Sequence, residues 1–259
     1  MATSIKILFT LILLTNSVYA APWDLFGSWP TPGINPRGYS GGGGEFIVQD
    51  GPEPYIYRIW LTSYGETSII SSFPAPGGPA AWGLVYDPMG GDYFRVSNNL
   101  TSWIYKITMD GSVVSSFFCP LPGPAGMDIT YDYSPSGGYL FVAIPAQNLI
   151  AEINQNTGSL MRTFAAPGVH PTAYGAVAYS HGYPYYVTDD YTHKVYKNAT
   201  PVITLQNPVG FSYWSNTNGQ ITLIFVVDDT TDYIYVYETD ETYSSAAPAS
   251  LGRIKALFK

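Results

Sequence analysis

An internal repeat of about 40–50 residues constrains the fold of this 259-residue chain more than any other feature. An apolar residue followed by Tyr, as in Ile56-Tyr57, recurs in this or a closely related form at intervals of 48, 46, 45 and 39 residues. Two further markers recur between these pairs, always in the same order. The first is an aromatic residue followed by Ser or Asp, and the second is an apolar run. The chain therefore contains five copies of one unit, whose pairs begin at Ile56, Ile104, Ile150, Val195 and Ile234.

Each copy has the residue pattern of four short β-strands. The first contains Gly and the aromatic–polar pair, and the second is almost continuously apolar, as in Ile224–Val227. The third alternates, with Tyr55, Tyr57 and Ile59 on one face, which is the period of two that a half-exposed strand requires. Pro and Gly separate the strands and set the turns. No segment before residue 250 has convincing helical periodicity, so the sequence predicts an all-β protein.

The repeat predicts a β-propeller of five four-stranded antiparallel blades. A single four-stranded sheet cannot bury both of its faces, whereas blades stacked in a ring bury each face against a neighbour. The last copy, Gly210–Thr239, has only three strands, and Trp23–Trp29 has the pattern of a fourth strand with nothing before it. We therefore expect this N-terminal strand to join the last blade and close the ring. An open sandwich is the alternative, but it does not explain the two complementary gaps.

Composition narrows the functional class. The chain has 11 basic and 19 acidic residues, a net charge of −8, and 12% charged against 16% aromatic residues. This balance excludes an intrinsically disordered chain, which needs high charge and few aromatic residues. It also argues against a partner nucleic acid, because nucleic-acid-binding proteins need a basic surface. Cys119 is the only cysteine, so no intramolecular disulfide can form, and its apolar surroundings predict a buried, inert thiol.

The two ends differ from the repeated region. Residues 1–20 have a basic start, a short apolar run and a small-residue site between Ala20 and Ala21, which is the pattern of a cleaved signal peptide. The apolar run is too short to span a membrane, and no later run is long enough. We expect the propeller domain, residues 21–243, to be secreted or held at the cell surface. Residues 244–259 are a small-residue linker and a short basic tail, interpreted either as a sorting signal or as a helix packed on the domain.

The motifs resemble the broad YVTN/NHL/TolB-like group of bacterial propeller repeats. The segment Tyr186-Val187-Thr188-Asp189 and the recurring patterns Phe-Val-x-Asp and Ile-Tyr-x-Ile carry the resemblance, over about residues 24–239. It implies the propeller fold but no particular activity, because the group includes binding domains, scaffolds, lyases and lactonases. The lactonase-like members need acidic and Asn ligands around a channel metal, and no clear set of that kind stands out here.

Candidate binding residues follow from the usual connectivity of a blade. The links from the second to the third strand, and from one blade to the next, emerge at the same end of the ring around the channel mouth. Carboxylates, amides and aromatic residues in these links suit a sugar or a Ca²⁺ ion, which bind aromatic platforms and oxygen ligands respectively. The alternative is that Asp and Asn here only cap turns. The candidates are Arg37, Trp82, Asp128, His170, Tyr174, Asp189 and Asp228.

No catalytic set is evident, and Ca²⁺ is the only cofactor that the sequence suggests. The three histidines lack close metal-ligand spacing, and there is no nucleophile elbow or phosphate loop. The preferred interpretation is an exported, non-catalytic binding module for a glycan, a peptide or a surface protein. One alternative is a hydrolase or lyase that acts on a carbohydrate or lactone through Asp128, Asp189 and Asp228. Another is a structural subunit of a cell-surface assembly.

Overall fold

The computed structural model describes residues 23–42, 45–50, 54–87, 92–130, 138–176, 185–215 and 222–239. These ranges consist mainly of β-strands, with a short 3-10 helix, η1 (Pro145–Gln147). No helix within them is long and apolar enough to cross a membrane. The predicted signal peptide and the predicted basic tail lie outside the described residues.

The strands form five four-stranded antiparallel sheets, which we number I to V. Sheet I contains β2 (Pro36–Gly42), β3 (Glu45–Asp50), β4 (Tyr55–Leu61) and β5 (Thr67–Pro74). Sheet II contains β6 (Ala81–Asp87), β7 (Tyr93–Asn98), β8 (Trp103–Thr108) and β9 (Val113–Phe118). Sheet III contains β10 (Met127–Thr130), β11 (Tyr139–Ile144), β12 (Leu149–Asn154) and β13 (Leu160–Ala165). Sheet IV contains β14 (Pro171–Ala176), β15 (Tyr185–Asp189), β16 (Lys194–Lys197) and β17 (Thr200–Thr204). Sheet V contains β18 (Pro208–Ser215), β19 (Thr222–Asp228), β20 (Tyr233–Glu238) and β1 (Leu25–Pro30).

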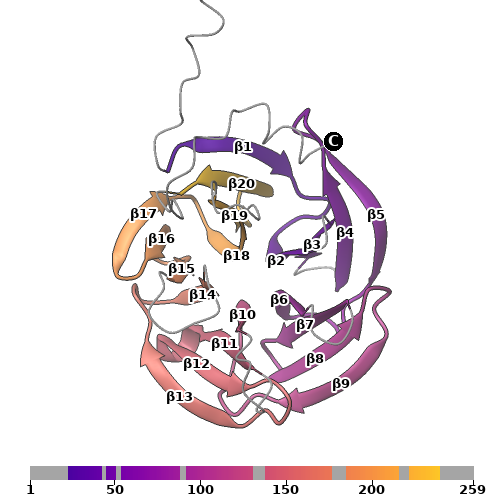
Figure 1. The fold of residues 1–259 in the computed structure, drawn as a ribbon, viewed down its shortest axis with the longest axis vertical. Coiled ribbons are helices and arrows are strands. Elements are labelled where there is room, and N and C mark those ends of the chain that lie inside the picture. The colour runs from indigo at the N-terminus through magenta and orange to yellow at the C-terminus, as the bar shows by residue number, and fades with distance from the viewer. Residues whose placement is uncertain are drawn as a thin grey trace, which may run out of the picture.

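The sheets stand around a common centre, as the blades of a β-propeller do (Figure 1). The first strand of each sheet is innermost, so that β2, β6, β10, β14 and β18 surround the centre, and the fourth strand lies at the rim. The predicted all-β propeller arrangement is therefore confirmed.

The first described strand of the chain belongs to sheet V. β1 pairs antiparallel with β20, with Ser28 opposite Tyr235 and Trp29 opposite Ile234. Trp29 is 5% exposed, and its indole Nε1 donates a 2.8 Å hydrogen bond to the carbonyl oxygen of Thr62 in the turn after β4. β1 therefore contacts both sheet V, to which it belongs, and the neighbouring sheet I.

Neighbouring inner strands approach each other closely at glycines that lie in, or directly before, the first strand of each sheet. A Cβ on Gly38 would lie 2.5 Å from the carbonyl oxygen of Trp82, and one on Gly83 would lie 2.0 Å from that of Ala125. Hydrogen bonds cross the same junctions, as from Ser97 Oγ to Ala125 O between sheets II and III. The other junctions contain Tyr86 N to Ser40 Oγ, Gly126 N to Thr172 O, Thr172 Oγ1 to Pro208 O, and Gly41 N to Ser212 Oγ.

The hydrophobic core lies between the faces of neighbouring sheets. Between sheets V and I, for example, Tyr39 stacks on Phe225 with 5.6 Å between the ring centroids, and Ile59 packs in the same cluster. Cys119 is fully buried in the cluster between sheets II and III. Burial raises the pKa of its thiol to about 11, so the thiol stays protonated at neutral pH. The predicted buried, inert cysteine is confirmed.

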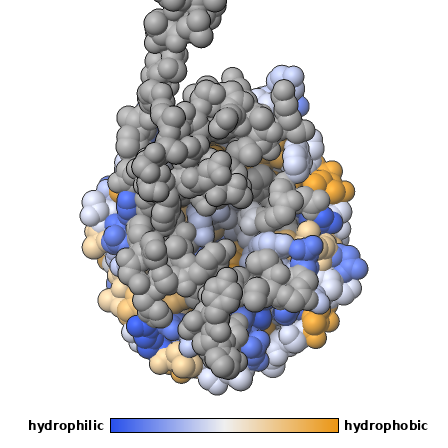
Figure 2. All heavy atoms as spheres, in the orientation of Figure 1, coloured by the Kyte–Doolittle hydropathy of each residue, from blue (hydrophilic) through white to orange (hydrophobic). Residues whose placement is uncertain are grey.

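The rim combines exposed apolar residues with irregular strand edges. Ile69, Val113 and Leu160 are exposed on β5, β9 and β13, and hydrophobic residues are visible at the periphery in Figure 2. The register of all five outer strands shifts once against the adjoining strand. Because a bulge at a free edge hinders pairing with another strand, these shifts protect the rim from edge-to-edge association.

Candidate functional site

Most of the candidate residues lie at one end of the propeller, which we call the mouth end. Here the second strand of each sheet passes to the third, and the chain arrives from the preceding sheet. β15 and β19 end here at Asp189 and Asp228. His170 directly precedes β14, and Arg37 and Trp82 are the second residues of β2 and β6. The connectivity therefore brings these five residues to the same end of the ring.

Asp189 and Asp228 are turn caps, which is the alternative that the sequence left open. Both are completely buried. Burial raises the pKa of Asp189, but the hydrogen bonds that the carboxylate accepts outweigh this effect and leave its pKa below the usual value. The donors to Asp189 are Val169 N, His170 N, Thr192 N and Thr192 Oγ1. The donors to Asp228 are Gln206 N, Asn207 N, Thr230 N and Thr231 N.

In sheet IV, the residue after the cap is accessible from the mouth. Asp190 Oδ1 lies 2.6 Å from Nδ1 of His170, and the two side chains are 13% and 21% exposed. The imidazole ring of His170 stacks on Tyr191, with 4.1 Å between ring centroids and an interplanar angle of 9°. Tyr191 itself is 68% exposed. Sheet IV thus offers an imidazole–carboxylate pair next to an exposed aromatic ring.

Sheets V, I and II supply a second group. Asp229 Oδ2 lies 3.2 Å from Nη1 of Arg37, and Oδ1 accepts a hydrogen bond from the side chain of Asn207. The guanidinium of Arg37 lies over the ring of Trp82, 4.7 Å from its centroid, which is a cation–π contact. Burial raises the pKa of Asp229, the ion pair with Arg37 opposes this rise, and Asp190 adds to it. Both groups lie at the mouth end, and we refer to them together as the mouth cluster, made of Arg37, Trp82, His170, Asp190, Tyr191, Asn207 and Asp229.

Backbone irregularities place Arg37 and Trp82 in this cluster. The register of β2 against β3 shifts around Arg37, and that of β6 against β7 shifts around Trp82, so both residues are extra to the regular ladder. Such bulges re-aim a side chain. The same shift in β14 and β18 falls at Thr172 and Val209, which are completely buried. Among these four inner strands, only β2 and β6 present a long side chain from this position.

Trp82 also has an unpaired donor. Its Nε1 is buried and has no hydrogen-bond partner within the described part of the chain. A buried donor without an acceptor costs free energy, so this atom is unusual in a folded protein.

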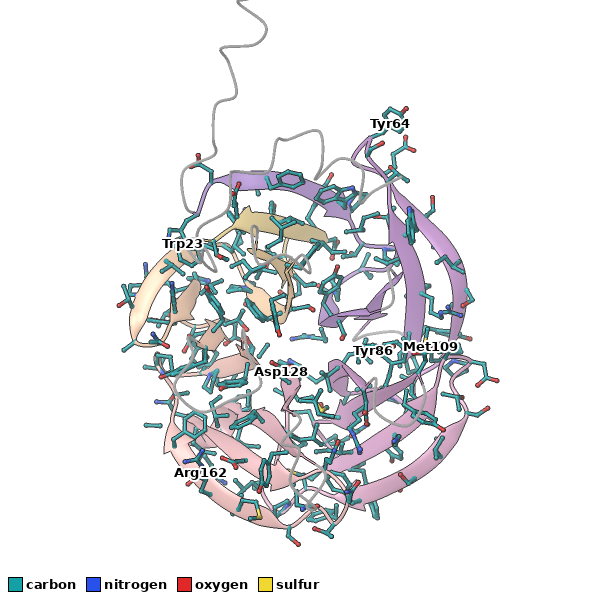
Figure 3. The ribbon with its side chains drawn as sticks, viewed as in Figure 1. Trp23, Tyr64, Tyr86, Met109, Asp128 and Arg162 are labelled. Atoms are coloured by element: carbon teal, nitrogen blue, oxygen red, sulfur yellow. The ribbon has the colours of Figure 1, made fainter. Side chains whose placement is uncertain are left out.

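Besides the caps Asp189 and Asp228, two further sequence candidates lie outside the mouth cluster. Tyr174 is 6% exposed in the core between sheets III and IV, where its ring stacks on Phe141 at 5.2 Å and on Tyr185 at 5.7 Å. Burial raises the pKa of Tyr174, and the carboxylate of Asp128 raises it further. Asp128 lies on β10, the innermost strand of sheet III, near the centre of the ring (Figure 3).

The described residues contain no group of three or more His, Cys, Asp or Glu side chains that could hold a metal ion. Asp189 and Asp228, two of the candidate ligands, use their oxygens in the turns. The mouth cluster contributes two further carboxylates, and one of them is already ion-paired with Arg37. Ca²⁺ takes at least six oxygen ligands, which include backbone and amide oxygens, and a Ca²⁺ site at the mouth stays a prediction from the sequence.

Sequence reasoning missed the importance of Asp190, Asp229, Tyr191 and Asn207. A signal was present, because the segments 189–192 and 228–231 share the pattern Asp-Asp-x-Thr, and segment 98–101 repeats it with Asn. In all three, the first residue accepts a hydrogen bond from the backbone N–H of the Thr three positions later. That bond marks the first residue as the cap and leaves the second to contact other links, as Asp190 contacts His170 and Asp229 contacts Arg37.

No protein-family model and no curated protein sequence matches the chain. Solved structures are similar to it. A glutaminyl cyclase from Myxococcus xanthus superposes with a TM-score of 0.61 at 11% identity, over 84% of this chain and 97% of that chain. A catalytically inactive virginiamycin B lyase from Staphylococcus aureus gives a TM-score of 0.45 at 18% identity, over 78% of this chain and 66% of that one. An auxiliary nutrient binding protein from Bacteroides thetaiotaomicron gives 0.44 at 13% identity, over 79% and 59%.

These similarities and the arrangement of the sheets define a class, the β-propeller proteins. The similarity to the glutaminyl cyclase covers almost all of that enzyme, but at 11% identity it supports the fold alone. The function therefore has to be argued from the mouth cluster.

Proposed function

We propose that this protein is an exported five-bladed β-propeller that binds a ligand, without catalysis, at the mouth cluster. The blade count and the closed ring are supported by the five sheets, by the pairing of β1 with β20, and by hydrogen bonds at all five sheet junctions. Export is supported by the signal-peptide pattern of residues 1–20. The ligand classes to consider are a glycan, a peptide and a surface protein.

The unpaired Nε1 of Trp82 carries the proposal. It lies in a cluster that is partly exposed, beside a guanidinium that is 31% exposed. A ligand acceptor that reached this donor would recover the free energy that the unpaired group costs. Arg37 and the exposed ring of Tyr191 add a charged contact and an aromatic surface, which are the residue types that dominate binding energy at interfaces.

The experiment screens the mature chain against arrays of neutral oligosaccharides and of short peptides, and then repeats each positive with variants. Trp82→Phe keeps a ring but removes Nε1, and we expect it to weaken binding about tenfold, the equivalent of one lost hydrogen bond. Trp60→Phe makes the same change on β4, outside the cluster, and should have no effect. Absence of binding to every probe, or equal binding by the Trp82→Phe variant, would overturn the proposal.

A second candidate function is a hydrolase or lyase, favoured by the raised pKa of Asp229 and the nearby carboxylate of Asp190. A carboxyl group with a raised pKa is the kind of group that general acid catalysis uses. Turnover of polysaccharides or lactones by the mature chain, abolished in the Asp229→Asn variant, would establish it. Turnover that is unchanged in that variant would exclude Asp229 as the acid.

A further inference from the structure

Large apolar side chains are exposed around the mouth cluster. They occur in the links of the mouth end or at the first residue of a third strand, and they come from several sheets. Trp103 and Phe118 form an edge-to-face pair across β8 and β9, with 6.1 Å between their centroids. The set includes Ile34, Tyr55, Leu100, Trp103, Tyr191 and Tyr233, which are between 38% and 79% exposed. An exposed apolar group of this kind marks an interaction surface.

The charge of this end is acidic. Asp190 and Asp229 belong to the cluster, while Arg37 is its only permanently basic side chain. The segment from Asp24 to Tyr243 as a whole has 7 basic and 19 acidic residues, a net charge of −12. An acidic surface with exposed apolar residues fits a basic, apolar peptide better than a neutral glycan, because opposite charges attract across an interface and a neutral sugar gains nothing from them.

The sequence contains a segment of this composition. Residues 251–259, Leu-Gly-Arg-Ile-Lys-Ala-Leu-Phe-Lys, combine three basic side chains with four large apolar ones. The segment lies outside the described residues. The described chain ends just after β20. Glu238, the last residue of β20, pairs with Leu223 at the start of β19. β19 runs from there to the mouth end, so β20 ends at the end away from the mouth. The chain therefore leaves the propeller at the end opposite the mouth.

We propose that the mouth end of one copy binds residues 251–259 of a second copy. The inference rests on the proposed function, since it identifies the ligand of the mouth cluster as a peptide. Residues 240–250 span at most about 40 Å and start at the end opposite the mouth, so reaching the mouth of the same copy requires this linker to pass around the rim. Binding to a second copy has no such constraint. Because donor and acceptor surfaces lie at opposite ends, the contact is head-to-tail and generates an open chain of molecules.

The test is analytical ultracentrifugation of the full mature chain over a wide concentration range, at low and high salt. We expect the mass to rise beyond a dimer with concentration at low salt, and to fall towards the monomer at high salt because charge pairs are screened. Reversing two charges with Arg253→Glu and Lys255→Glu should weaken association at least tenfold, an order-of-magnitude figure for two lost charge contacts. The thermal melt should not change, because these residues are outside the described fold.

Variants on the mouth end complete the design. Leu100→Ser with Trp103→Ser should weaken association as the charge reversal does, and the matched pair Ile69→Ser with Ile70→Ser, exposed on the rim, should not. A synthetic peptide of residues 250–259 should dissociate the wild-type assembly, which keeps the test valid if a mouth variant misfolds. A monomer at every concentration, or association that survives the charge reversal or the mouth variants, would overturn the inference. Binding of an array probe by a strictly monomeric chain would leave the proposed function standing and overturn only this step.

Discussion

At the scale of single residues, two adjacent carboxylates have opposite tasks. Asp189 has a lowered pKa because it accepts four hydrogen bonds from two turns. Asp190, one residue later, is partly exposed and faces His170. The pair Asp228 and Asp229 repeats this division, and the pKa of Asp229 is raised by burial. A structural cap and a candidate binding residue thus lie one position apart in the chain.

This division predicts unequal effects of two neighbouring substitutions. Asp189→Ala should lower the free energy of unfolding by about 2–4 kcal/mol, because several buried donors lose their acceptor. Asp190→Ala removes a partly exposed pair and should cost less than about 1 kcal/mol. Denaturant unfolding at neutral pH measures both values. Equal losses would show that Asp190 is also structural.

The lowered pKa of Asp189 predicts the direction of a pH effect. Its contribution to stability is complete above the ordinary Asp pKa of about 3.9 and is lost as the pH falls through the lower pKa of the folded state. The wild type should therefore lose more stability on acidification than the Asp189→Asn variant, which has no charge to lose there. Unfolding curves at a series of acidic pH values measure the difference, and parallel pH dependences would contradict it.

At the scale of elements, the inner strands determine how closely the sheets stand. The contact at Gly83 involves a backbone oxygen, which cannot move aside as a flexible side chain can. The corresponding contact at Gly210 is looser, because a Cβ there would meet its nearest atoms at 3.2 Å. The contact at Gly83 therefore sets the spacing of sheets II and III more tightly than the contact at Gly210 sets the spacing of sheets V and I.

Two matched substitutions test this spacing. Gly83→Ala should destabilise the fold by about 3 kcal/mol or more, since overpacking against a rigid neighbour strains the backbone. Gly210→Ala should cost about 1 kcal/mol or less, because small shifts relieve its contacts. Thermal or denaturant unfolding gives both values. The reverse order would mean that the two junctions can relax in ways that the static distances do not reveal.

The elements also show how far sequence reasoning reaches. The alternation in β4 and the apolar run in β19 identify strands because burial imposes those periods on the residues themselves. The links of the mouth end followed from connectivity. The register shifts around Arg37 and Trp82 could not be predicted, because a bulge depends on the partner strand and not on local sequence. Tyr174 was misplaced for a related reason, since residue type alone does not tell whether an inner-strand ring faces the channel or the next sheet.

At the scale of the whole molecule, the two ends of the propeller domain meet in one sheet. Trp23 N donates a 2.7 Å hydrogen bond to the carbonyl oxygen of Glu238, so the start of β1 lies next to the end of β20. Antiparallel strands placed in this way can be joined by a short loop. β1 could therefore occupy the same place in sheet V if it followed β20 in the sequence instead of preceding β2.

A circular permutant tests this conclusion. A chain that starts at Asn35 and carries residues 23–31 after Thr239, through a short Gly-rich loop, should fold and melt within about 5 °C of the wild type, since all strand pairings are kept. Deleting residues 23–31 instead should cost about 4 kcal/mol or more, the typical effect of losing a buried Trp plus further contacts. Calorimetry compares the two. A permutant as unstable as the deletion would show that the connection from β1 to β2 is itself needed.

The register shift that recurs in the inner strands has a consequence for how the sequence can diverge in evolution. Arg37 and Trp82 stand on a backbone kink that two other sheets share, so the framework does not depend on which side chains occupy it there. Under the proposed function, descendants of this chain could exchange both residues, and with them the ligand, while the sheets stay intact. Thr172 and Val209 have no such freedom, because they are packed inside. New ligand specificities should therefore arise at sheets I and II, which carry Arg37 and Trp82. The corresponding positions in sheets IV and V, Thr172 and Val209, should stay unchanged.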